Sequence, residues 1–316
     1  MCIRDRSRTA LLAVAAFALA SCGKTSSLQS PAAGGGASPT ASDQAQIAQA
    51  LQEASVFVQE DLTTSSLPFE ADARGTFAVV RPWRFWREIT DVQTTMETAY
   101  SNPDSLGRPR LATVTIHRAL TGTFNLVGRV FSDTDTTIAR VRKPLADDWT
   151  RRIALIRRPI PNDTGLTRWR LAGTSGVDVR TKGGATRILS LHVVATGLDT
   201  TITDPLELHR LHRVFRVAAG DTVTVTATTQ ANDDVVLFRG YDVRRRFVNN
   251  GDGTHTFKFR SGVFRGLRHF AVDALSHGTL FDDTAPYDAN IWAMIFSIER
   301  VRMPSDVDGG DDGDRR

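Results

Sequence analysis

The stretch PWRFWREITDVQTTMETAYSN, residues 82–102, decides between helix and strand near the start of the folded part of this chain. Its large apolar residues recur at steps of three and then four: Trp83, Trp86, Ile89, Val92 and Met96. Apolar residues at this spacing lie on one face of an α-helix. The pattern therefore predicts a helix over residues 82–102 that packs its apolar face against the core.

A second helical pattern precedes this stretch, and strand patterns follow it. In residues 42–62 the candidate N-caps are Ser42 and Asp43. The apolar side chains of this segment fall at roughly helical spacing: Ile47, Leu51, Val56 and Val58. From residue 108 onward the period changes to two, and IPNDTG, residues 160–165, has the composition of a hairpin loop. Helices followed by antiparallel strands form an α+β pattern.

This order of elements resembles the NTF2-like cone fold over residues 42–181. In that family, N-terminal helices fill the concavity of a strongly bent sheet. The resemblance implies a pocket in the cone, with four candidate lining residues: Trp83, Trp86, Tyr100 and His117. Family members that are enzymes use an Asp/His or Tyr pair in the cone, and no such pair can be placed in this sequence. Core packing is the alternative explanation for both tryptophans.

Residues 184–303 are rich in short strand patterns. TVTVTATT, residues 222–229, alternates strictly, and the Asn-Gly and Asp-Gly steps in residues 247–259 are typical of a β-hairpin. Short strands at regular spacing predict a β-sandwich, and the segment resembles bacterial immunoglobulin-like domains. The expected fold class is thus an α+β NTF2-like cone domain followed by an all-β immunoglobulin-like sandwich. No cysteine lies beyond Cys22, so that sandwich would have no disulfide.

The N-terminal segment predicts where in the cell the protein is located. Basic residues, the apolar run LLAVAAFALA and then LASC, residues 19–22, have the layout of a signal peptide over residues 1–21. LASC resembles the lipobox of bacterial lipoproteins, which implies lipidation at Cys22 and anchoring in a membrane. Gly23 after that cysteine favours the outer membrane, by resemblance only. An ordinary secretory signal with an incidental cysteine is the alternative.

Residues 1–5, MCIRD, match the in-frame translation of a transposon adapter used in sequencing libraries. We expect them to be an assembly artefact, with the true start upstream, rather than a genuine N-terminus that happens to match. Residues 22–41 are rich in Gly, Ser and Ala and predict a flexible tether. Residues 304–316 are acidic and predict a disordered tail. Their aspartates do not match the pattern of an EF-hand.

Charge argues against a nucleic-acid partner. The net charge is +4, and both signs are scattered along the chain. A nucleic-acid binder usually gathers its positive charge on one face. The densest basic run is Arg244 to Arg246, which is also expected of a solvated strand edge.

No motif for catalysis, metal or cofactor binding is complete. His209 and His212 lie three apart without the further ligands that zinc needs. His255, His269 and His277 could meet aspartates across strands for a metal or sugar contact. The sequence therefore favours a lipid-anchored, non-enzymatic envelope protein that binds or scaffolds another envelope component or a small ligand. The alternatives are an enzyme that uses a cone pocket and a carbohydrate- or wall-binding module that uses the sandwich loops.

Overall fold

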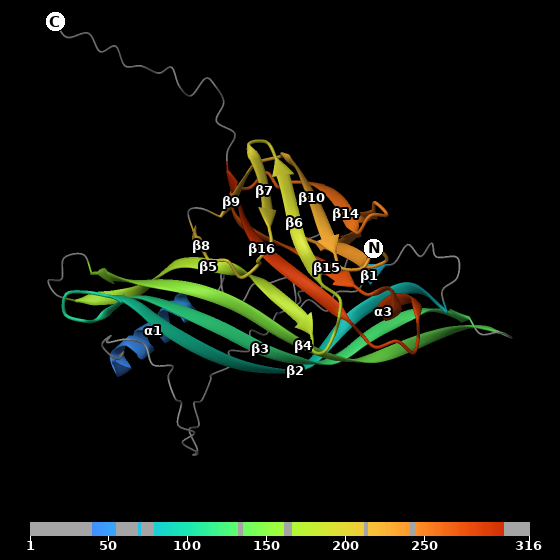
Figure 1. Ribbon diagram of the computed structural model, residues 1–316, viewed down its shortest axis with the longest axis horizontal. Helices are drawn as coiled ribbons and strands as arrows, with labels where there is room; N and C mark the ends of the chain where they lie inside the picture. The colour runs from blue at the N-terminus through green and yellow to red at the C-terminus, as the bar shows by residue number, and fades with distance from the viewer. Residues whose placement is uncertain are drawn as a thin grey trace, which may run out of the picture. The chain divides into compact units, whose positions relative to one another are not determined.

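Antiparallel strands make up most of the described chain. The computed structural model describes residues 40–54, 69–70, 79–131, 135–160, 166–211, 214–240 and 244–299 (Figure 1). All of them belong to one compact unit, residues 36–316. The described helices are α1 (Ala41–Glu53) and the short α3 (His277–Phe281).

The larger sheet has 11 strands among the described residues, in the order β1-β2-β3-β4-β5-β16-β15-β11-β12, with β8 added to β5 and β9 to β16. Its strands are β1 (Phe69–Glu70), β2 (Val80–Pro103), β3 (Pro109–Phe131), β4 (Thr136–Pro159), β5 (Thr167–Thr181), β8 (His209–Arg210), β9 (Phe215–Ala218), β11 (Val235–Arg239), β12 (Arg244–Arg246), β15 (Gly266–Leu275) and β16 (Ala289–Glu299). The pairing of β5 with β16 joins the N-terminal strands to those at the C-terminal end of the described chain.

The smaller sheet has 5 strands in the order β13-β14-β10-β6-β7. They are β6 (Ile188–Ala195), β7 (Leu198–Ile202), β10 (Thr222–Thr229), β13 (Val248–Asn249) and β14 (Thr254–Arg260). The predicted hairpin at β13 and β14 is confirmed. Gly251 and Gly253 in its turn have φ angles of 86° and 81°, which favour glycine.

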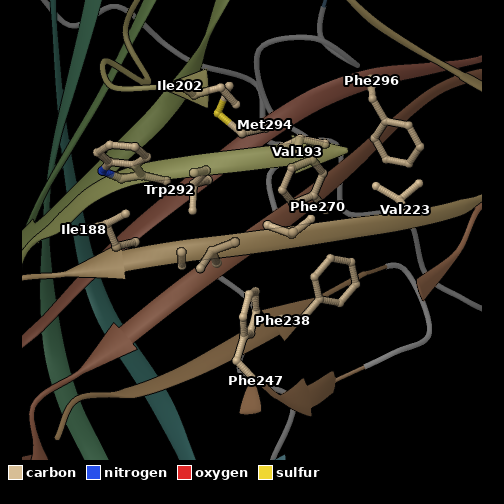
Figure 2. Packing of buried hydrophobic residues seen from close by; sticks show 14 of the residues in the cluster. Ile188, Val193, Ile202, Val223, Phe238, Phe247, Phe270, Trp292, Met294 and Phe296 are labelled. Atoms are coloured by element: carbon tan, nitrogen blue, oxygen red, sulfur yellow. The ribbon is translucent and has the colours of Figure 1, made fainter. Parts of the chain in front are cut away.

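The smaller sheet packs on one face of β11, β15 and β16. Figure 2 shows Val193 and Val223 of the smaller sheet in one cluster with Phe238, Phe270 and Phe296 of the larger sheet. The opposite face of the same three strands contributes to two further apolar clusters. Because both faces of β16 are covered, nearly every side chain in ANIWAMIFSIE is buried. A continuous apolar run is the pattern expected of a strand buried on both faces.

Helix α1 confirms part of the first helical prediction. The predicted N-caps, Ser42 and Asp43, are wrong, because the N-cap is Thr40 and Asp43 completes a capping box with it from the third helical position. Ile47 and Leu51 are buried in the cluster that also contains Trp169. The indole Nε1 of Trp169 donates to Asp43 Oδ1 at 3.0 Å, which fixes the start of the helix on β5. The rest of the predicted stripe, Val56 and Val58, lies outside the described residues.

The predicted helix over residues 82–102 is wrong, because this stretch is strand β2. β-Bulges explain part of the misleading period. Ile89 lies opposite Gly122 and Val92 lies opposite Leu120, so three steps on β2 match two steps on β3. The extra residue of a bulge shifts the alternation by one. Two apolar residues three apart therefore occupy the same face of a strand, as they would on a helix.

Glycines on β3 face both bulges of β2. The register shifts between Pro82 and Arg84, and again between Ile89 and Asp91. An added Cβ at Gly128 would lie 2.3 Å from the carbonyl oxygen of Arg81, next to the first bulge. An added Cβ at Gly122 would lie 2.0 Å from the carbonyl oxygen of Glu88, next to the second. The strand therefore needs glycine on its neighbour at both positions.

These findings overturn the expected fold class. An NTF2-like cone needs N-terminal helices packed in a bent sheet. The described residues are instead mostly strand, and they contain two helices, α1 and the short α3. The α+β cone followed by an immunoglobulin-like sandwich is therefore wrong. The structure instead has two mainly antiparallel sheets, of which the larger includes strands from β1 near residue 69 to β16 near residue 299.

Candidate arginine–tryptophan face

One face of β2, β3 and β4 gathers arginine and tryptophan side chains. We call it the arginine–tryptophan face, and its members are Arg81, Trp83, Arg84, Trp86, Arg129, Arg140 and Arg142. Cross-strand partners lie on the same side of a sheet. Trp86 on β2 is opposite Asn125 on β3, which is in turn opposite Arg142 on β4. The inward-facing neighbours, Phe85 and Leu126, are buried.

The first bulge helps to build this face. Trp83 is the extra residue between Pro82 and Arg84, and its ring lies 5.8 Å from the guanidinium carbon of Arg129. Without the bulge, Trp83 and Trp86 would point to opposite sides, because side chains alternate along a strand. Trp83 is 39% exposed, so its indole is open to solvent on this face.

Two arginines contact the indole of Trp86. The guanidinium carbons of Arg84 and Arg140 are 5.6 Å and 5.0 Å from the centre of the Trp86 ring. Arg140 is also held by Asn125 Oδ1, to which its Nε and Nη2 donate at 3.1 Å and 2.7 Å. Cation–π contacts and hydrogen bonds of this kind hold a positive charge in a defined place.

Positive charge predominates on this face. Glu88, on the same side of β2, is the one acidic residue beside these members among the described strand positions, and its carboxylate lies 3.5 Å from Arg140. Arg81 and Arg129 are directly opposite each other on neighbouring strands. Like charges in that position destabilise a sheet. A surface rich in arginine is suited to an anionic partner.

The structure brings together two of the four predicted pocket residues. Trp83 and Trp86 share the arginine–tryptophan face, as described above. Tyr100 lies about 45 Å further along β2 at roughly 3.3 Å per residue, where its ring packs on Trp169 with centroids 6.2 Å apart. The Nδ1 of His117 is 3.2 Å from Thr150 Oγ1 on β4. These four side chains do not line a common cavity among the described residues.

A buried charge network lies behind this face, and the sequence analysis missed it. Asp273 on β15 is fully buried and contacts Arg239 Nη2, while Arg87 Nη1 lies 3.7 Å from the same carboxylate oxygen. Arg87 Nε donates to Tyr287 Oη at 2.7 Å, and that hydroxyl donates to Asp147 Oδ2 at 3.1 Å. Asp273 lies in the otherwise apolar run FAVDAL. A charged residue inside an apolar strand pattern indicates a buried charge, and this feature of the sequence could have predicted the network.

Burial dominates the titration of this network. It raises the pKa of the Asp147 carboxyl, although the positive charge of Arg87 and two hydrogen bonds oppose the rise. It also raises the pKa of Tyr287 well above its ordinary value, so the phenol stays neutral. Burial lowers the pKa of Arg239 to about 10, although Asp273 opposes this fall and Arg87 adds to it.

The network adjoins a small pocket. Its free volume is about 10 Å³, and it is lined by Phe85, Trp86, Arg87, Phe124, Arg239, Arg244 and Leu275. A single water molecule needs about this much room. The enclosed part of the pocket therefore has room for about one water molecule.

The predicted metal contacts are not assembled in the described part of the chain, which contains no group of three candidate ligands. The ring of His209 packs on Phe215, and His212 lies outside the described residues. The Nε2 of His255 is 3.2 Å from Thr229 Oγ1. Cys22 and the acidic tail also lie outside the described residues.

Comparison with protein families, curated proteins and solved structures finds no match for this chain. None of the helices that the structure describes is long and apolar enough to cross a membrane. The functional argument therefore depends on the chemistry of the arginine–tryptophan face and on the N-terminal sequence.

Proposed function

We propose that this protein is a lipid-anchored, non-enzymatic binding protein of the bacterial cell envelope, attached through Cys22, most simply to the outer membrane. We propose further that its arginine–tryptophan face binds an anionic envelope glycan. The observation that carries this proposal is the set of five arginines and two tryptophans on one face of three neighbouring strands.

The chemistry of the face fits a charged sugar polymer. Guanidinium groups form paired hydrogen bonds with carboxylates and phosphates. The exposed indole of Trp83 offers a flat apolar surface beside those charges. Because Arg140 is held by Asn125 and Trp86, little conformational entropy is lost when it binds a ligand.

The predicted location of the protein favours an anionic glycan over a nucleic acid as the ligand. Positive charge with aromatic rings also suits single-stranded nucleic acid. A signal peptide followed by a lipobox would place the folded part outside the cytoplasm, where anionic glycans are abundant. The small free volume beside the buried network supports a surface ligand rather than an enclosed one.

The anchoring part is tested by Cys22→Ala. We expect the change to abolish incorporation of labelled palmitate and to release the protein from the membrane fraction. Labelling that persists in the variant would refute the lipobox interpretation. Binding by the face is tested separately, so either part can fail alone.

The binding part is tested with polygalacturonate as the anionic probe and neutral dextran as its control, by calorimetry at two salt concentrations. We expect Arg140→Gln to weaken polygalacturonate binding about tenfold or more, since contacts to charged groups contribute about 1.5–3 kcal/mol. Arg152→Gln is the matched control, because Arg152 is exposed on the same strand about 40 Å away at roughly 3.3 Å per residue.

Three outcomes would contradict this part of the proposal. The first is equal binding of dextran and polygalacturonate. The second is an equal loss of affinity in Arg140→Gln and Arg152→Gln. The third is tighter binding of a single-stranded oligonucleotide than of polygalacturonate at the same salt concentration, which would assign the face to nucleic acid.

A further inference from the structure

The second half of β2 is an open edge of the larger sheet. β2 pairs with β3 from residue 80 to residue 103, but β1 pairs with its other edge only at Arg84 and Phe85. Among the described residues, no strand pairs with that edge from residue 91 to residue 102. We call residues 91–102 the open edge. At roughly 3.3 Å per residue, it presents about 40 Å of backbone whose alternate N–H and C=O groups point away from β3.

The apolar side chains of the open edge are only half covered. Val92 lies opposite Leu120, and Met96 lies opposite Ile116. Leu120 and Ile116 are buried in the cluster that also contains Trp169, so Val92 and Met96 are on the apolar side of the sheet. Yet Val92 is 48% exposed and Met96 is 55% exposed. One further strand along this edge would cover both side chains and satisfy the backbone groups.

A second edge of the same sheet shows how this protein protects such a segment. Residues 136–146 of β4 pair with β3, and pairing of β4 with β5 begins only at Asp147. This stretch contains three basic residues and a proline: Arg140, Arg142, Lys143 and Pro144. Basic side chains, inward charges and proline are the usual devices that prevent pairing at an edge. The open edge of β2 has no Lys, Arg or Pro, so it is not protected in this way.

We propose that the open edge pairs antiparallel with the open edge of a second copy of this chain, which joins two larger sheets into one. A two-fold axis brings the same segment of both copies together, so that segment must be complementary to itself. This inference goes beyond the proposed function, and it depends neither on lipidation at Cys22 nor on glycan binding.

The open edge is complementary to itself about Met96. With the two-fold axis beside Met96, each Val92 lies opposite Tyr100 of the other copy, and both are on the apolar side of the sheet. The two acidic residues of the segment do not meet each other, because their opposite positions are uncharged: Asp91 faces Ser101, and Glu97 faces Thr95. Apolar pairs directly opposite each other stabilise a sheet, and like charges there would destabilise it.

The first test is sedimentation velocity of the full chain in the Cys22→Ala background under reducing conditions, so that neither a lipid nor a disulfide joins two copies. We expect a dimer whose fraction rises with concentration. Met96→Lys places two positive charges opposite each other beside the axis and should raise the dissociation constant about tenfold or more. Ile138→Lys is the matched control, because it adds the same charge at an apolar side chain of β4 that is 69% exposed. It should leave the dissociation constant unchanged.

Hydrogen exchange provides a second measurement without any substitution on β2, independent of whether Met96→Lys folds. Peptides that cover residues 91–102 should exchange more slowly at high concentration than after dilution, since pairing protects their amides. Peptides that cover residues 136–146 are the internal control and should exchange equally at both concentrations.

Three results would overturn the proposal. The first is a monomer at every concentration tested. The second is an equal dissociation constant for Met96→Lys and Ile138→Lys, which would place any dimer contact elsewhere. The third is exchange in residues 91–102 that dilution does not change.

Discussion

The second bulge of β2 makes a sharp prediction about Gly122. In Gly122→Ala the new Cβ would lie 2.0 Å from the carbonyl oxygen of Glu88 and 2.9 Å from the Cα of Ile89. Both atoms belong to the backbone, so no side chain can rotate away. The bulge must open, and the ladder between β2 and β3 must shift around it.

We expect Gly122→Ala to lower the free energy of unfolding by about 3 kcal/mol, the upper end for overpacking, because the clashing atoms are backbone. At roughly 2–4 °C per kcal/mol for a chain of this size, Tm should fall by about 6–12 °C. Gly262→Ala is the matched control. Its new Cβ meets only Ile298 Cδ1, at 3.5 Å, which is an ordinary contact.

Urea denaturation followed by circular dichroism measures the difference. The control should keep its midpoint or gain about 0.4–1 kcal/mol, because alanine restricts the unfolded chain. The midpoint of Gly122→Ala should be clearly lower at a similar m-value. If the two variants differ by less than about 0.5 kcal/mol, β2 does not carry this bulge, and the explanation of its misleading period fails.

Two further predictions concern buried charges. Asp273→Asn leaves Arg87 and Arg239 without their shared carboxylate and should lower the free energy of unfolding by about 3–5 kcal/mol. The control is Asp199→Asn, at an exposed ion pair, which should cost less than about 1 kcal/mol in the same urea titration. Equal losses in the two variants would refute the role of the network. Burial lowers the pKa of Lys143 from 10.5 to about 8, although the charge of nearby carboxylates opposes this fall. Between pH 8 and 10.5 the unfolded chain therefore binds more protons than the folded chain at this site. The free energy of unfolding should rise with pH over this range. Urea titrations from pH 8 to 10.5 should show that Lys143→Met has lost this rise, and an unchanged slope would contradict the prediction.

Local pattern predicted much of the fold after residue 108. Alternation in TVTVTATT and the turn glycines of residues 247–259 correctly gave β10 and the hairpin of β13 and β14. Helix α1 was also predicted, because the Ile47–Leu51 spacing depends on neighbours within a few residues, although its N-cap is Thr40 rather than Ser42 or Asp43. These signals are local, so one sequence suffices to detect them.

Residues 82–102 show where prediction of secondary structure from local apolar spacing fails. Ile89 and Val92 lie on one face of β2 because Gly122 on β3 leaves room for a bulge between them. That cause lies about thirty positions away in the chain. The β-branched residues of the stretch favour a strand, as their propensity indicates, but the three-residue spacing imitated a helix.

The candidate site was predicted in part. Trp83 and Trp86 were identified as a pair, whereas Tyr100 and His117 lie elsewhere. The arginines beside the tryptophans are scattered in the sequence, and no local run of charge marks them as one group. They gather because Arg129 and Arg140 stand on neighbouring strands in register with β2.

The sequence by itself therefore determined what depends on neighbours along the chain: the helical spacing of Ile47 and Leu51 in α1, the alternating strands, the hairpin turns, and the expectation of an N-terminal lipid anchor at Cys22. The tertiary structure alone decided which residues meet across strands. It converted a helical spacing into a bulged strand, gathered dispersed arginines around two tryptophans, and enclosed Arg87, Arg239 and Asp273 together. Which distant strands pair, and where a glycine on one strand permits a bulge on its neighbour, depends on residues far apart in the chain, and the patterns within one segment do not show it.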